Sequence, residues 1–244
     1  MTTTEMKASF LILYDKVTNF AAAGYENDEI SLFLTKAQEQ LVKRYYNYKG
    51  NKYKEGFEET EKRRKDLAEL IMHENIDCSL LIAGDDLLTA ANGIFVELPG
   101  KLLYTLREEA EIENTTSTCK APNGSILSVK PITHDEYTIN IRNPFKRPDN
   151  TQVWRVDYSS GTNGIRRHEL ITDGTYTIKT YKIRYLRRPE DIVVKDDLNN
   201  ITGVDSELNP SMHQEIVDTA VRIASGITDP QTYQIKVNEE QQGE

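Results

Sequence analysis

Three short segments hold residues that could recognise a protein partner. Residues 143–148 (NPFKRP) put one aromatic ring and two cations on a loop that prolines hold extended. Arginine doublets at 166–167 and 187–188 could each bind a carboxylate through bidentate hydrogen bonds. Residues 233–237 alternate and could add a strand to another sheet's open edge. The candidate subunit-contact residues are Phe145, Lys146, Arg147, Arg166, Arg167, Arg187, Arg188, Tyr233, Ile235 and Val237.

Each of these segments also has a plainer interpretation. The NPFKRP stretch could be a stiff connector, and the two arginine doublets could be solvated turns. The alternating residues near the end of the chain could be disordered. The sequence leaves these alternatives open.

Catalytic chemistry has little support in the sequence. The four histidines are scattered, and there is no HExxH or CxxC pair for a metal. There is also no GxSxG elbow and no glycine-rich phosphate loop. The adjacent carboxylates at 85–86 and 196–197 would point to opposite faces of a strand, so we interpret them as solvated loop acids. We expect no enzyme activity, no catalytic residue, no cofactor and no metal, although a zinc site built on His73 and Cys78 stays open.

The charge is unevenly distributed along the 244 residues, whose formal net charge is −9. Residues 1–141 carry −7, residues 142–188 carry +7 and residues 189–244 carry −9. The acidic total weighs against an ordinary nucleic-acid-binding protein. A basic segment between acidic ones favours pairing within the chain or between identical subunits, with a solvated basic face as the alternative.

The composition also indicates where the chain folds. No apolar run approaches the roughly 20 residues of a membrane span, and no secretory signal is visible at the N-terminus. Two cysteines are too few for a disulfide framework. We therefore expect a protein that folds in a reducing cytoplasm without contacting a membrane.

Apolar spacing predicts helices in the first 98 residues, which contain no proline. We expect helices at about 4–18, 28–48 and 54–72, and a later one at about 211–226 that follows Asn209-Pro210.

Shorter alternating runs predict strands between residues 76 and 188. The phase of alternation slips at Lys179-Thr180, which predicts a β-bulge. The predicted strands are residues 79–83, 94–98, 102–110, 126–129, 137–142, 152–158 and 176–185.

These elements predict an α+β fold with an N-terminal helical bundle and an antiparallel, hairpin-rich β domain. We expect residues 1–75 to be helical, residues 76–188 to form the β domain, and residues 189–228 to supply an acidic loop and a closing helix that packs on the bundle. Residues 229–244 would form a flexible tail that acts as an assembly arm.

Four stretches of the chain resemble a known family in order. They are DEISLFLTKAQEQLV, ITHDEYTINIRNPFKRP, YKIRYLRRPEDIVV and NPSMHQEIVDTAVRIA. Together they resemble the ring or adaptor proteins of the head-to-tail connector in crAss-like tailed bacteriophages. The resemblance implies a non-enzymatic virion protein, assembled in the host cytoplasm into a dodecameric ring below the portal. Its expected partners are the portal protein and other tail or ring proteins, and genomic DNA would pass through the channel without sequence-specific binding.

Two other classes of function remain open from the sequence. A tail-associated hydrolase that cleaves cell-wall glycan needs two carboxylates about 5–10 Å apart, and acidic residues are abundant here. A plain scaffold-binding or regulatory module is the other alternative. Gel filtration and negative-stain imaging would separate rings from both.

Overall fold

The computed structural model divides the chain into two compact units. Met1–Leu70 with Arg188–Glu244 form one, called the helical unit, and Ile71–Arg187 form the other, called the strand unit. The structure describes residues 1–17, 24–47, 57, 59–78, 92–113, 122–159, 166–196 and 201–228.

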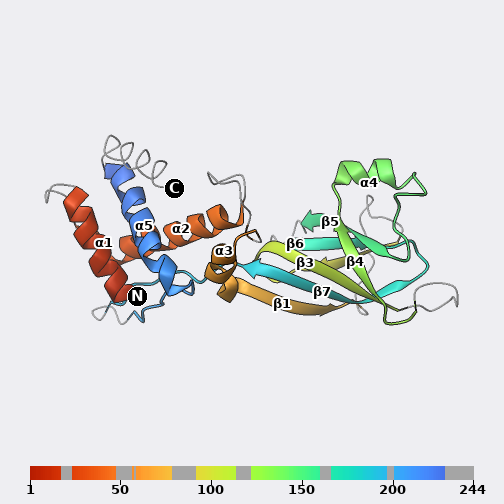
Figure 1. Ribbon diagram of the computed structural model, residues 1–244, viewed down its shortest axis with the longest axis horizontal. Helices are drawn as coiled ribbons and strands as arrows, with labels where there is room; N and C mark the ends of the chain where they lie inside the picture. The colour runs from red at the N-terminus through yellow and green to blue at the C-terminus, as the bar shows by residue number, and fades with distance from the viewer. Residues whose placement is uncertain are drawn as a thin grey trace. The chain divides into compact units, whose positions relative to one another are not determined.

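The helical unit is built on three longer helices. The last of them, α5, contacts both α1 and α2, as Figure 1 shows. The predicted helices at 4–18, 28–48 and 211–226 are confirmed with small shifts at their ends. In chain order the helices are α1 (Thr3–Val17), α2 (Asn27–Tyr46), α3 (Glu61–Asp66), the 3-10 turn η2 (Ala68–Leu70), the 3-10 turn η3 (Pro210–Met212) and α5 (His213–Thr228).

Helix α2 shows how its sequence specifies the element. Glu26 and Glu29 form a reciprocal capping box at its start, which satisfies backbone donors that have no partner within the helix. Its apolar residues recur at helical spacing and face the core. The buried residues of α2 are Ile30, Phe33, Leu34, Ala37, Gln38, Leu41, Val42 and Tyr45.

The predicted helix at 54–72 is confirmed only over residues 61–66, which form α3, and the described residues 57, 59 and 60 lie outside any helix. Helix α3 ends at Asp66, η2 follows, and the chain enters strand β1 (Ile71–Asp77). All seven β1 residues pair with β7 (Thr177–Arg187), and this long-range pairing overrides the local helical pattern. Residues 54–56 and 58 lie outside the described part of the chain.

The strand unit contains one curled seven-stranded sheet with the order β1-β7-β3-β4-β5-β6-β2. All neighbouring strands are antiparallel except β4 and β5, which are parallel. The mixed α+β class is therefore confirmed, with one parallel pair that the sequence did not predict. The remaining strands are β2 (Gly93–Glu97), β3 (Leu102–Glu113), β4 (Ile126–Pro131), β5 (Gln152–Ser159) and β6 (Arg166–Ile171).

The predicted strand at 137–142 is wrong, because this segment forms helix α4 (His134–Asn140). Thr133 and Glu136 make a capping box at its start, and this local hydrogen bonding outweighs the strand propensity of the following residues. The T-H-D-E sequence was the signal that should have predicted a helix.

The predicted bulge in the last strand is confirmed. Glu111 pairs with Thr180 and Ile112 pairs with Ile178, so Lys179 has no paired residue on β3. The Lys179 carbonyl instead accepts a hydrogen bond from the Cys78 amide at 2.9 Å. The phase slip in the sequence therefore corresponds to a real irregularity in the ladder.

The predicted strands at 94–98, 102–110, 126–129, 152–158 and 176–185 each fall on an observed strand. The predicted strand at 79–83 lies outside the described residues. Strands β1 and β6 were missed, since β1 is mostly polar and β6 starts with two arginines.

Candidate functional site

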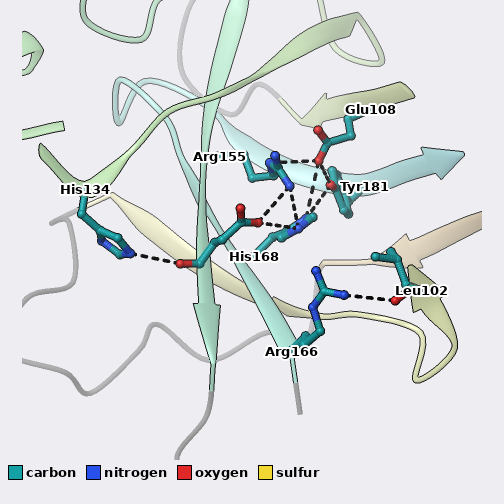
Figure 2. A network of polar contacts seen from close by, with 8 residues as sticks. Leu102, Glu108, His134, Arg155, Arg166, His168 and Tyr181 are labelled. Atoms are coloured by element: carbon teal, nitrogen blue, oxygen red, sulfur yellow. Dashed lines mark hydrogen bonds and ion pairs between the residues drawn. The ribbon is translucent and has the colours of Figure 1, made fainter. Parts of the chain in front are cut away.

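A buried polar network lies at the centre of the strand unit. Arg155 on β5 extends toward Glu108 on β3, with 3.3 Å between its Nε and the Glu108 Oε1 (Figure 2). The side chains of Arg155 and Glu108 are only 11% and 6% exposed. A buried ion pair stabilises a fold only when further hydrogen bonds satisfy the remaining polar atoms of both side chains.

His168 on β6 links this ion pair to two further strands. Its Nδ1 lies 2.8 Å from the hydroxyl of Tyr181 on β7, and its Nε2 lies 2.8 Å from the Nη1 of Arg155. The Tyr181 hydroxyl in turn donates to Glu108 (Figure 2). The network therefore joins four strands through side chains far apart in the sequence.

Asp157 on β5 completes the network at its solvent side. Its Oδ1 lies 3.1 Å from His168 Nε2 and accepts from Arg155 Nη1 at 3.0 Å. The hydrogen bond with His168, followed by the charge of Arg155, lowers the pKa of the Asp157 carboxyl. Burial, followed by the charge of Glu108, raises the pKa of Tyr181 and keeps it a neutral donor.

A groove of about 570 Å³ opens beside this network. Strands β3 and β4 pair at three positions, from Glu109 with Ser128 to Glu111 with Ile126, and the pairing stops on the Glu108 side. The Arg155–Glu108 pair lines the groove there. Each carboxylate of the network faces a cation, an arrangement that favours a structural role in joining β3 to β5. The groove is lined by residues 105–109 of β3, residues 126–129 and 131 of β4, and Arg155.

A second feature, the cationic knob, lies on α4 and the turn that follows it. It consists of Ile139, Ile141, Arg142, Phe145, Lys146 and Arg147, all of which are exposed. Phe145 is 95% exposed, the highest value among the exposed large hydrophobic residues that the structure describes. The knob has three cations and no acid of its own.

The turn of the knob is ordered by hydrogen bonds to one residue. The Asn143 side-chain oxygen accepts from the Phe145 amide at 3.0 Å, and its carbonyl accepts from the amides of Lys146 and Arg147, each at 3.1 Å. The following Pro148 is buried. Phe145, Lys146 and Arg147 are therefore displayed on a defined turn instead of the extended loop that the two prolines predicted, because backbone amides of the turn bond back to Asn143.

The two arginine doublets contact groups of their own units. Arg166 donates to the Leu102 carbonyl at 3.0 Å (Figure 2), and Arg167 pairs with Glu97 at 2.5 Å. Arg187 is half-buried near the end of β7. Arg188 is exposed and pairs with Glu39 at 2.8 Å and with Asp191 at 3.0 Å.

The remaining candidate residues, Tyr233, Ile235 and Val237, lie outside the described part of the chain. Of the open zinc pair, His73 is exposed and Cys78 is buried, and burial raises the pKa of the Cys78 thiol to about 11. No group of three or more His, Cys, Asp or Glu side chains among the described residues could hold a metal ion. None of the helices described here is long and apolar enough to cross a membrane.

The amino-acid sequence alone did not predict the buried network. On strand β5, Arg155 and Asp157 lie two residues apart on one face, and Arg155 is almost fully buried. Opposite charges two residues apart on one strand face were the available signal. Their partners on β3, β6 and β7 could not be located from the sequence.

The two units of the fold differ in net charge. The helical unit has 16 Lys and Arg residues against 24 Asp and Glu residues, a net charge of −8. The strand unit has a net charge of −1, with the cationic knob as a local exception.

Comparison with known proteins defines the class of this fold. Residues 1–235 match the family described as Phage tail ring protein 3/4, and the chain belongs to that family. It is 32% identical over 234 residues to Ring protein 4/5 of Bacteroides phage crAss001, covering 92% of each chain. It is 30% identical over 230 residues to Ring protein 3 of the same phage, covering 92% of this chain and 95% of that protein. The resemblance to crAss-like phage ring proteins is confirmed.

Proposed function

We propose that this protein is a non-enzymatic structural component of the virion that assembles into a closed ring. The observation that carries this proposal is the family match over residues 1–235, together with two ring proteins that align along 92% of this chain. A likeness over nearly the whole length supports a shared architecture and role.

We place the ring in the head-to-tail connector below the portal, with genomic DNA passing through its channel. The net charge of −9 supports this placement, because an acidic wall does not retain a polyanion. The partners would be the portal protein and neighbouring ring or tail proteins. We propose twelve copies per ring and assembly in the host cytoplasm, by resemblance to the family.

The ring would close through heterologous contacts between two different surfaces of the same chain. We propose Phe145, Lys146 and Arg147 as contact residues because they are exposed on a defined turn. Arg166, Arg167, Arg187 and Arg188 stay candidates with a weaker case, since the first two and Arg188 already contact groups of their own unit. Residues 229–244, with Tyr233, Ile235 and Val237, are proposed as an assembly arm that reaches a neighbouring subunit.

Negative-stain imaging of the purified protein, with its mass in solution, tests this proposal. We expect closed rings whose mass is that of twelve chains, and peptides of this protein in purified virions by mass spectrometry. A protein that stays monomeric at all concentrations and is absent from virions would contradict the proposal. Truncation of residues 229–244 tests the arm, because the free protein should keep its melting temperature while incorporation into particles falls.

A further inference from the structure

We infer that the cationic knob binds the acidic helical unit of a second copy of this chain. This inference rests on the proposed ring and names the two surfaces that would form its subunit contact. It depends on three observations: the exposure of the knob, its rigidity and the distribution of charge between the units.

The knob concentrates exposed apolar surface. Three of the nine exposed large hydrophobic residues in the described chain lie on it: Ile139 at 71%, Ile141 at 38% and Phe145 at 95%. Exposed apolar side chains close in sequence to cations are typical of a protein-binding surface. Aromatic residues with neighbouring arginines are also the residue types that dominate binding energy at interfaces.

The knob is held in place at both ends. The Tyr137 ring on α4 meets the Trp154 ring edge-on, with centroids 6.3 Å apart. After the turn, the Asp149 carbonyl accepts from the Tyr176 hydroxyl at 2.7 Å. A surface fixed in advance loses less conformational entropy on binding, which favours a role in recognition.

Charge complementarity identifies the surface that the knob would meet. The helical unit has a net charge of −8, opposite in sign to the three knob cations, whereas the strand unit is nearly neutral. Opposite charge steers association and fixes the register of two surfaces.

The helical unit also presents apolar side chains beside carboxylates. On α1, Ile12 is 56% exposed and lies one turn from Asp15, which is also exposed. On α2, Leu32 is 51% exposed and lies one turn from the exposed Asp28 and Glu29. Each surface could receive an aromatic ring flanked by cations.

Nucleic acid fits the knob less well. Three cations would neutralise few phosphates, and the exposed Ile139, Ile141 and Phe145 would find no apolar partner on a duplex backbone. Contact of the knob with DNA is therefore an outcome of the test that would overturn the inference.

Zero-length carbodiimide coupling, which joins a lysine amine to a contacting carboxylate, tests the contact. Rings assembled from mixed ¹⁵N-labelled and unlabelled chains should give mixed-label peptides that join Lys146 to Asp or Glu residues of the helical unit. The Lys146→Arg variant keeps the charge and lacks the amine, so it should form rings without this cross-link. Cross-links from Lys146 only within one chain, only to the strand unit, or none in intact rings would overturn the inference, as would protection of Lys146 by DNA alone.

Assembly of knob variants gives an independent readout. Phe145→Ala combined with Lys146→Glu and Arg147→Glu should raise the concentration needed for ring formation at least tenfold, without loss of the folded circular dichroism spectrum. Lys130→Glu is the matched control, since Lys130 is an exposed strand-unit lysine outside the knob. If the knob variant forms rings as well as wild type, the inference is wrong while the proposed function stands. If wild type forms no rings, the proposed function itself fails.

Discussion

Tyr137 and Trp154 form an aromatic contact that helps fix α4 to the sheet. Their rings are inclined by 82°, with centroids 6.3 Å apart, and Trp154 is only 1% exposed. This edge-to-face contact links the helix that begins the cationic knob to strand β5. The most exposed aromatic residue of the described chain, Phe145, is therefore carried by an element whose own aromatic residue is anchored.

Replacing Tyr137 and Phe145 one at a time should distinguish a side chain that stabilises the fold from one that is available for binding. Tyr137→Ala should lower the free energy of unfolding by about 1–3 kcal/mol, because it removes a half-buried ring from its contact with Trp154. Phe145→Ala should change it by less than about 0.5 kcal/mol, because the ring is in solvent. Urea denaturation followed by Trp154 fluorescence measures both. Equal losses in the two variants would show that Phe145 packs within its own subunit.

Arg155 should be the most sensitive cation of the strand unit. Arg155→Ala leaves the buried Glu108 carboxylate without its arginine partner and should lower the free energy of unfolding by about 3–5 kcal/mol. The control is Arg107→Ala, which removes a 68% exposed side chain paired with Glu109 and should cost less than about 1 kcal/mol. Chemical denaturation of both variants tests this difference. A small effect at Arg155 would mean that water reaches and screens Glu108.

Acid should weaken the strand unit through Asp157. The pKa of this carboxyl is lowered in the folded state, first by the hydrogen bond with His168 and then by Arg155. The ionised group therefore contributes stability above its unfolded pKa of about 3.9, and this contribution is lost as the pH falls further toward the folded pKa. The stability difference between wild type and Asp157→Asn should be constant above about pH 5 and shrink below about pH 4. A difference that stays constant down to pH 3 would contradict the proposed linkage.

Glu215 should be the key carboxylate of the helical unit. It accepts from Arg44 Nη2 and from the Tyr45 hydroxyl, each at 2.7 Å, so it ties α5 to α2. Glu215→Ala leaves both donors without this acceptor and should lower the free energy of unfolding by about 1–3 kcal/mol. Asp218→Ala on the same helix is the matched control, since Asp218 is exposed and its change should cost less than about 1 kcal/mol. Thermal unfolding of both variants measures the difference, and equal melting temperatures would contradict it.

The sequence determined the features that depend on neighbouring residues. The spacing of apolar residues located α1, α2 and α5, since a helix places residues three and four apart on one face. The slip of alternation at Lys179 located the bulge, because strand periodicity is also local.

Only the tertiary structure decided the features that depend on distant residues. Strand β1 forms because it pairs with β7, about a hundred residues later, and its own polar sequence carries no strand signal. The network of Glu108, Arg155, His168 and Tyr181 exists because the sheet order brings four strands together. Pairing between strands is set by long-range backbone hydrogen bonds and shared burial, and no local periodicity encodes which strands become neighbours.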